Sequence, residues 1–375
     1  MLSTETVTDR ETTLAARYQA VGALQERLNN PALSTLDETI AQAVKLASND
    51  LCYGETQDLR VHIHGVQQMT RLRGGLQSLG MNGTLAKMVI ITDKIISIAL
   101  ELPPLYSPSE ITTYLPRFLP SITSAPTNSS PATTTPTTLP EGLDEATSAL
   151  LKDITFLVDT VLALPASPSE WELSKVVTMS NWVYGRLHTP SSPTSTSGVS
   201  STTSSAMHQS IRLAALLYCR AIQARKPLSQ VVGEQDVVEI VDAVWKVPLE
   251  VWNGTRSNSD GQVGRVQGQG KGQGQGLLGT LVWTLAGILP VAKGMEGAYT
   301  TKTMMMAAAV QEAMRRSDRL EGENGNGLGV IGVLERIGRL QRWLEGGQGM
   351  MLQASSNSGP SKRGGSGSPG LGGQA

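Results

Sequence analysis

The sequence predicts an all-α protein, a multi-helix bundle-like single domain with long disordered loop insertions. Apolar residues recur at helical spacing along most of the chain, and no strand-like alternation bounded by hairpin turns appears. Tracts rich in Ser, Thr and Pro, or in Gly and Gln, separate the periodic segments. Such tracts bury too little apolar surface to offset the entropy of ordering their backbone, so we expect them to be mobile.

The low-complexity tracts define the predicted domain limits. Insertions are predicted at residues 121–139, 189–205 and 254–276. The segments between them are too short to fold separately, and long surface insertions cost little closure entropy. We therefore predict a flexible N-terminal arm at 1–31, one helical domain over 32–346 and a disordered Gly/Ser tail at 347–375.

The first predicted helix begins at a capping box, Thr35-Leu-Asp-Glu38, and its apolar stripe ends at Leu51. The second, Leu59 to Gly75, is amphipathic: one side carries Leu59, His62, Ile63, Val66 and Met69, and the other carries Arg60, His64, Gln67 and Arg71. We interpret the cations of that second side as a solvated face. Gly74 and Gly75 end this helix, because glycine adopts left-handed conformations at low steric cost.

A long apolar helix is predicted over Leu85–Glu101, and it stops before Pro103-Pro104 because proline cannot continue a helix. We expect it to pack antiparallel to the 59–75 helix, since the connection is short and contains glycine. His62 should then be mostly buried with a hydrogen-bond partner. Further helices are predicted at 141–164, 169–188, 206–225, 234–251, 277–289, 301–320 and 330–345.

Composition argues against several classes of protein. Thirty-one basic residues balance thirty-two acidic ones and aromatics make up 4% of the chain, so neither the basic excess nor the stacking platform of a nucleic-acid binder is present. The polar N-terminus is unlike a secretory signal, and two distant cysteines, Cys52 and Cys219, favour a reducing compartment. The longest apolar run, Met88 to Leu102, is interrupted by Asp93 and Lys94 and is too short to span a bilayer, so no membrane association is expected.

The sequence also predicts no metal, no cofactor and no catalytic residue. Cys52, His62 and His64 are neighbours in sequence, but helical residues two apart point about 200° apart, so one metal cannot readily take both histidines. The dinucleotide-like glycines of Gly327–Gly332 follow acidic, glycine-rich residues instead of the required buried strand. No Gly-x-Ser-x-Gly elbow occurs. The coactivator-like leucine spacing at Leu213–Leu217 is interpreted as core.

One segment resembles a known family. Residues 59–75 read Leu-Arg-Val-His-Ile-His-Gly-Val-Gln-Gln-Met-Thr-Arg-Leu-Arg-Gly-Gly. The His-x-x-Gly spacing, the Leu-Arg-Gly-Gly ending and the aspartate of the next helix resemble the fungus-specific transcription factor domain, the helical regulatory half of zinc binuclear-cluster regulators. The likeness is densest over Ile40–Pro104, although Ile90-Ile91-Thr92 stand where the family often has a tryptophan. Full-length members carry six cysteines in a zinc module that reads DNA, and this chain has two, so specific DNA binding is not expected.

The resemblance implies a transcription-regulator-like protein of the nucleus. It would act through protein partners of the transcription machinery or another regulator, or through a small effector. The alternative is a cytoplasmic accessory protein or enzyme of a metabolic or biosynthetic cluster, with an interhelical ligand pocket. The motif positions that the resemblance singles out, as structural or regulatory residues, are His62, Gly65, Arg73, Gly74, Gly75 and Asp93. We expect Arg73 to reach carbonyls or an acid on a neighbouring helix, and Gly74 or Gly75 to have a positive φ.

Overall fold

The computed structural model describes residues 7–53, 56–114, 143–188, 201–252, 275–292, 298–314 and 329–357. These residues form α-helices and two short 3-10 turns, with no strand among them. The all-α prediction is therefore confirmed. The buried apolar side chains of these segments form one continuous core.

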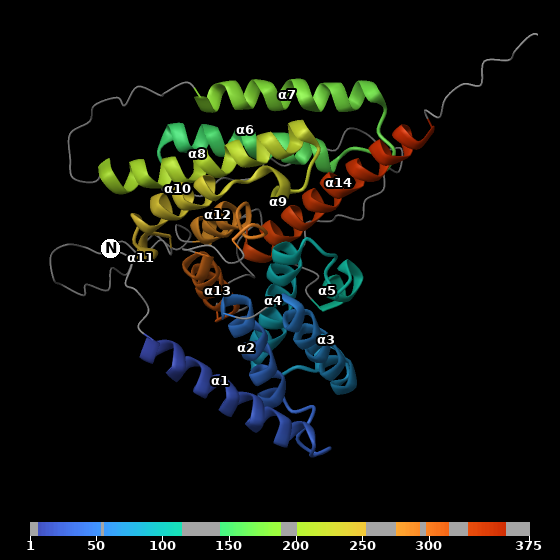
Figure 1. The fold of residues 1–375 in the computed structure, drawn as a ribbon, viewed down its shortest axis with the longest axis vertical. Coiled ribbons are helices and arrows are strands. Elements are labelled where there is room, and N and C mark those ends of the chain that lie inside the picture. Colours follow the sequence, from blue (N-terminus) through green and yellow to red (C-terminus); the bar gives the residue numbers. More distant parts are fainter. Residues whose placement is uncertain are drawn as a thin grey trace, which may run out of the picture.

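The first group of helices occupies the lower part of Figure 1, where α2 and α3 pack on α4 and α1 packs on α2. It consists of α1 (Val7–Leu28), α2 (Asp37–Tyr53), α3 (Thr56–Arg73), the turns η1 (Leu76–Ser78) and η2 (Met81–Gly83), α4 (Thr84–Leu100) and α5 (Pro108–Tyr114). α3 packs mainly on α2 and only lightly on α4, so the predicted antiparallel pairing of α3 with α4 is wrong as the main contact. α2 meets α3 through an apolar stripe whose Ile40, Val44 and Leu51 are buried, whereas α4 is also packed by α13 and α14.

The second group forms the upper layers of Figure 1. It contains α6 (Glu145–Leu162), α7 (Glu170–His188), α8 (Ser201–Ala224), α9 (Leu228–Val231), α10 (Glu234–Trp245) and α11 (Leu249–Trp252). α7 lies outermost, and α8 beneath it packs against α6, α7 and α10. Exposed tryptophans therefore occur on the outer helix, where Trp171 and Trp182 face solvent.

Three C-terminal helices join the two groups. They are α12 (Gln275–Ala286), α13 (Ala298–Met314) and α14 (Val330–Asn357). α12 has a buried run from Leu278 to Leu281 and is enclosed by its neighbours, because a helix that is apolar all round must be covered. α14 crosses the molecule diagonally and contacts α4, α6 and α12 (Figure 1).

Local polar residues set where several helices begin. Asp144 caps α6 by accepting the backbone N–H of Thr147 at 2.7 Å. Ser169 and Glu172 form a reciprocal capping box at the start of α7, with contacts of 2.7 and 3.3 Å. Asp236 accepts the N–H of Gly233 at 2.8 Å and so caps α10. These caps explain why the helix positions are readable from the sequence.

The domain limits differ from the prediction in two places. The segment predicted as a flexible arm is helical over Val7–Leu28, where Leu24 is buried and Arg17 contacts Asp50 of α2 at 2.8 Å. Among residues 15–28, whose side chains the structure describes, only Leu24 is buried, which is too weak an apolar pattern to predict this helix from sequence. The segment predicted as a tail is helical as far as Asn357, because Met350–Gln353 are good helix formers beyond the Gly346-Gly347 pair.

The predicted insertions lie almost wholly outside the described residues. Of residues 121–139 none is described, and of 254–276 only the last two are, because α12 begins at Gln275. Of 189–205 the last five belong to α8, which begins at Ser201, earlier than predicted.

A buried ion pair connects the first group of helices to α14. Lys94 of α4 donates to Glu335 of α14, and both side chains are more than nine-tenths buried. One turn further along α4 and nearly two turns further along α14, Gln341 donates to the carbonyl of Ile98 at 3.2 Å. We call these two contacts the α4–α14 joint.

The joint yields a prediction about stability. Glu335→Met should lower the free energy of unfolding by about 3–5 kcal/mol, because it leaves the Lys94 charge buried without its partner. The double variant Lys94→Met/Glu335→Met should cost far less, since an apolar pair of similar volume replaces both charges. Urea denaturation followed by circular dichroism measures both. Equal losses in the single and double variants would contradict this account.

Candidate functional site

The Arg-Gly-Gly corner closes α3. The N–H of Gly74 donates to Arg71 O at 3.0 Å and the N–H of Gly75 to Thr70 O at 2.9 Å, which is the Schellman pattern. Gly74 has φ 109° and Gly75 φ 94°, so the predicted positive φ is confirmed for both. A Cβ added to Gly74 would lie 2.7 Å from the hydroxyl of Ser78. Glycine is thus required here by backbone conformation.

Arg73 ties this corner to the start of α2. Its Nε lies 3.6 Å from Asp37 Oδ1, and Asp37 Oδ2 accepts the N–H of Gly80 at 2.9 Å. The expectation that Arg73 reaches an acid on a neighbouring helix is therefore confirmed. About a third of the Arg73 side chain stays exposed, so the pair contributes only about 0.2–1 kcal/mol.

His62 joins α3 to α2. Its Nδ1 contacts Asp50, a fully buried carboxylate that also binds Arg17 of α1. The predicted hydrogen-bond partner is confirmed, and so is the prediction that His62 is mostly buried, since 30% of its side chain is exposed. Gly65, one turn later, has open space where a Cβ would stand. His64 lies on the surface, as predicted.

Asp93 anchors the segment that follows α4. Its carboxylate accepts the N–H groups of Leu105 and Tyr106 at 3.0–3.2 Å. Burial raises the pKa of Asp93 to about 6, and these two backbone hydrogen bonds oppose the rise. Gln67 of α3 donates to the carbonyl of Leu105 at 2.7 Å and is buried, although the helical pattern puts it on the polar side of this helix.

The motif residues therefore hold three separate junctions. His62 acts where α1, α2 and α3 meet, Arg73 with its glycines acts at the start of α2, and Asp93 acts after α4. None of these residues lines either of the two best-formed hollows in the described part of the chain. Their contacts are those of a structural framework.

A hollow of about 560 Å³ lies at the other end of the molecule, between the ends of α6 and α8 and the side of α14. One wall is apolar and comes from the end of α6 and the turn after it. The other wall is cationic and aromatic. The lining residues are Val161, Leu162, Leu164, Pro165, Ala166, Pro168, Arg225, Arg339, Arg342, Trp343 and Gly346. We call it the three-arginine hollow.

Arg225 takes an unusual conformation at the edge of this hollow. It ends α8 with φ 49°, the left-handed region that costs most residues roughly 1–2 kcal/mol. Its guanidinium lies 5.6 Å from the ring centroid of Trp343, and its Nε is buried without a hydrogen-bond partner among the described residues. The N–H groups of Arg225 and Lys226 donate to the carbonyls of Ile222 and Ala221 at 3.3 and 3.2 Å, so this conformation belongs to the Schellman motif that ends α8.

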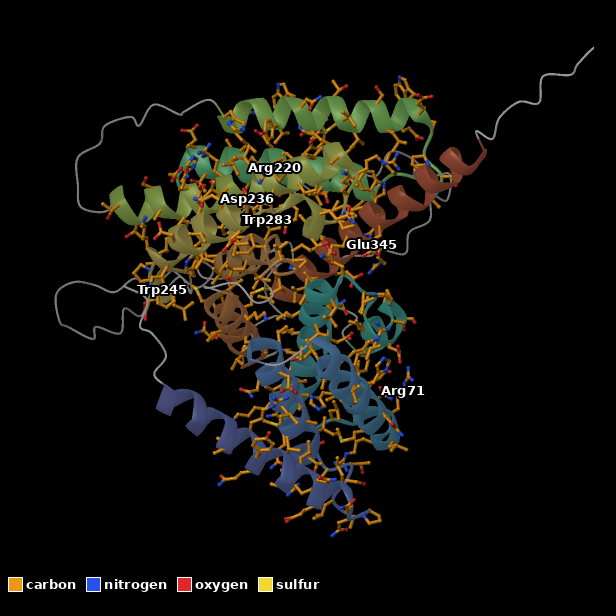
Figure 2. All side chains as sticks on the ribbon, in the orientation of Figure 1. Arg71, Arg220, Asp236, Trp245, Trp283 and Glu345 are labelled. Atoms are coloured by element: carbon orange, nitrogen blue, oxygen red, sulfur yellow. The ribbon has the colours of Figure 1, made fainter. Side chains whose placement is uncertain are left out.

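The other two arginines are held by α14. Arg339 donates to the carbonyl of Leu162 at 3.2 Å, which fixes it to the apolar wall. The Nη2 atom of Arg342 lies 3.9 Å from Glu335 Oε1, outside the hollow. Figure 2 marks Glu345 on α14, and burial together with the nearby Glu101 carboxylate raises its pKa, while Arg342 opposes the shift. Three arginines thus line a hollow that has no carboxylate among its lining residues.

Sequence reasoning missed this site. A signal was present, since Arg336, Arg339 and Arg342 recur every three residues and Trp343 follows them. Arg336 pairs with Asp159 and does not line the hollow. Arg225 lies more than a hundred residues from α14 in sequence, so only tertiary packing brings it to Trp343.

Other candidates from the sequence take structural places. Cys52 faces α13, where burial raises the pKa of its thiol and Thr303 and Lys302 oppose the rise. Among the residues that the structure describes, no group of three His, Cys, Asp or Glu is placed to hold a metal. Leu213 and Leu216 pack against the core, in which Leu217 is buried. No helix in the described segments is long and apolar enough to cross a membrane.

Comparisons with known proteins gave no match: neither a family model, nor a curated protein, nor a solved structure matches this chain.

The corner yields a pair of matched substitutions. Gly74→Ala should lower the free energy of unfolding by about 1–2 kcal/mol, because alanine strains at positive φ. Gly65→Ala, in open space within the same helix, should raise it by up to about 1 kcal/mol, since alanine is the better helix former. Thermal or urea unfolding measures both. A loss of stability in Gly65→Ala would show that this position needs glycine for a contact.

Asp93 yields a prediction about pH. Because its pKa is about 6 in the folded protein and near 3.8 otherwise, this carboxyl favours folding below pH 4 and loses that contribution as the pH rises through 6. Between pH 4 and pH 7, the free energy of unfolding of Asp93→Asn should therefore rise by about 2–3 kcal/mol relative to that of the wild type. Urea denaturation at four pH values tests it, with the exposed Asp242→Asn as control. Parallel curves for Asp93→Asn and wild type would contradict the assignment.

Proposed function

We propose that this protein is a regulatory helical domain that binds an anionic small molecule in the three-arginine hollow. The observation that carries the proposal is the convergence of Arg225, Arg339 and Arg342 on one hollow whose lining holds no acidic side chain. Guanidinium groups bind carboxylates and phosphates through paired hydrogen bonds. Two of these cations are pre-positioned, one over Trp343 and one on the carbonyl of Leu162.

The size and composition of the hollow specify the ligand further. A volume of about 560 Å³ lies within the range of sites for drug-sized molecules, and it far exceeds the volume of a single inorganic anion. The proline- and leucine-rich wall suits an apolar or planar body, and Trp343 suits an aromatic ring. We therefore propose an organic anion with an apolar or aromatic body and at least two negative charges.

A regulatory role fits this site better than an enzymatic one. The lining residues contain no histidine, cysteine, carboxylate or lysine, which are the usual general acids, bases and nucleophiles. The enzyme alternative would therefore need groups from elsewhere. The resemblance at residues 59–75 supports the same choice, and under it the protein would act in the nucleus through protein partners, without reading DNA itself. The ligand would act by shifting the balance between helix packings.

The experiment is isothermal titration calorimetry with naphthalene-1,5-disulfonate, a planar dianion. We expect binding that weakens as the salt concentration rises, because the charges are partly exposed. The double variant Arg339→Gln/Arg342→Gln should weaken binding at least about ten-fold, since each lost charged contact is worth about 1.5–3 kcal/mol. Arg336→Gln is the matched control, because Arg336 lies on the same helix and contacts Asp159.

Two further probes complete the test. Uncharged naphthalene-1-methanol should bind much more weakly than the disulfonate, because it lacks the negative charges. Pyrophosphate should also bind much more weakly, because it lacks the aromatic body. Absence of disulfonate binding, or equal losses in the double variant and in Arg336→Gln, would overturn the proposal.

A further inference from the structure

We infer that an anion in the three-arginine hollow and the buried Lys94–Glu335 pair are coupled through Arg342, so that occupancy of the hollow weakens the α4–α14 joint. This inference rests on the proposed function, because it requires an anion in the hollow. It adds a mechanism by which binding in the three-arginine hollow changes the packing of α14 against α4.

The coupling begins with a shared carboxylate. Glu335 and Arg342 are seven residues apart on α14, two helical turns, so their side chains lie on the same face. Glu335 Oε1 lies 3.9 Å from Arg342 Nη2, and Glu335 Oε2 contacts the ammonium of Lys94. One buried carboxylate is thus stabilised by two cations, of which one belongs to α4 and the other lines the hollow.

The two cations differ in freedom. The Lys94 side chain is 3% exposed and is confined between α4 and α14, whereas the Arg342 side chain is 40% exposed. An anion in the hollow attracts Arg342 without displacing any packed group. Lys94 has no such alternative, so the exchange of partners occurs at Arg342.

The exchange has an energetic consequence at the joint. A carboxylate that is more than nine-tenths buried depends on nearby cations to offset the cost of its desolvation. When Arg342 turns to the ligand, Glu335 keeps only Lys94 as compensation, so keeping this carboxylate buried at the joint costs more free energy. Thermodynamic linkage is reciprocal. If ligand binding weakens the contact between Glu335 and Arg342, then that contact weakens ligand binding by the same factor.

The joint is also the place where such a change has structural effect. Glu335 and Gln341 are the α14 residues that bond to α4, and Asp93 beside Lys94 holds the segment that leads to α5. α14 meanwhile contacts α6 and α12. A weaker joint therefore loosens the first group of helices against the rest, which is the kind of packing change that a partner could detect.

The test is a double-mutant cycle on the affinity for naphthalene-1,5-disulfonate, measured by calorimetry. Lys94→Met/Glu335→Met removes the pair at no change in net charge and should tighten binding about five-fold or more, because Arg342 is released to the ligand. In the Arg342→Gln background the same two substitutions should change the affinity less than about two-fold. Circular dichroism establishes that each variant is folded.

The matched control removes an ion pair elsewhere on the same helix. Arg336→Gln/Asp159→Asn also conserves net charge, and the pair it deletes lies outside the hollow, so the affinity should stay within about two-fold. A five-fold gain in this control, or an equal gain with and without Arg342, would show a general loosening or a long-range field and would overturn the coupling.

A reciprocal measurement reads the joint directly. Saturating disulfonate should speed amide hydrogen exchange in residues 91–98 of the wild-type protein at least about two-fold, and it should leave the pair-deleted variant unchanged. Unchanged or slowed exchange in the wild type would overturn the inference. Lack of binding to the wild type would instead refute the proposed function, whereas arginine-dependent binding that is indifferent to Lys94 and Glu335 refutes the coupling alone.

Discussion

Helix α4 imposes the constraint that organises this protein. It is enclosed on all sides, and its buried residues include polar and charged ones, namely Lys87, Thr92, Asp93, Lys94 and Ser97. Charges in such surroundings must find partners within the protein, because desolvation otherwise costs several kcal/mol. Lys94 is neutralised by α14, and Asp93 binds the backbone of the segment after its own helix. The course of α14 and the position of the segment leading to α5 both follow from these requirements.

The three-arginine hollow differs from this centre in a defined way. At α4 the buried charge of Lys94 is answered by an opposite charge and that of Asp93 by backbone donors. At the hollow three arginines line one site that has no acid among its lining residues, and Arg225 lies over the ring of Trp343. The charges at the centre of the protein are paired, whereas three arginines line the hollow without an acid beside them. This contrast supports a binding role for the hollow.

Arg342 is the residue that connects the two environments. It belongs to the hollow by position and to the buried pair by its contact with Glu335, 3.9 Å away. The motif residues within positions 59–75, by contrast, form junctions in the first group of helices. Their role is to position α2, α3 and the segment after α4. The family-like motif therefore belongs to the structural framework, whereas ligand binding is proposed for the three-arginine hollow.

The sequence by itself determined the all-α class, most helix positions and the glycine corner, because these depend on local periodicity, capping side chains and backbone conformations that neighbouring residues dictate. It also predicted that Arg73 would reach an acid on another helix. Tertiary structure alone decided that α3 packs on α2, that residues 7–28 form a helix, and that Gln67 is buried. It also brought Arg225 to Trp343 and Lys94 to Glu335, which are separated in sequence by more than a hundred residues. Such contacts depend on which faces meet in three dimensions, and helical periodicity specifies the faces without specifying their partners.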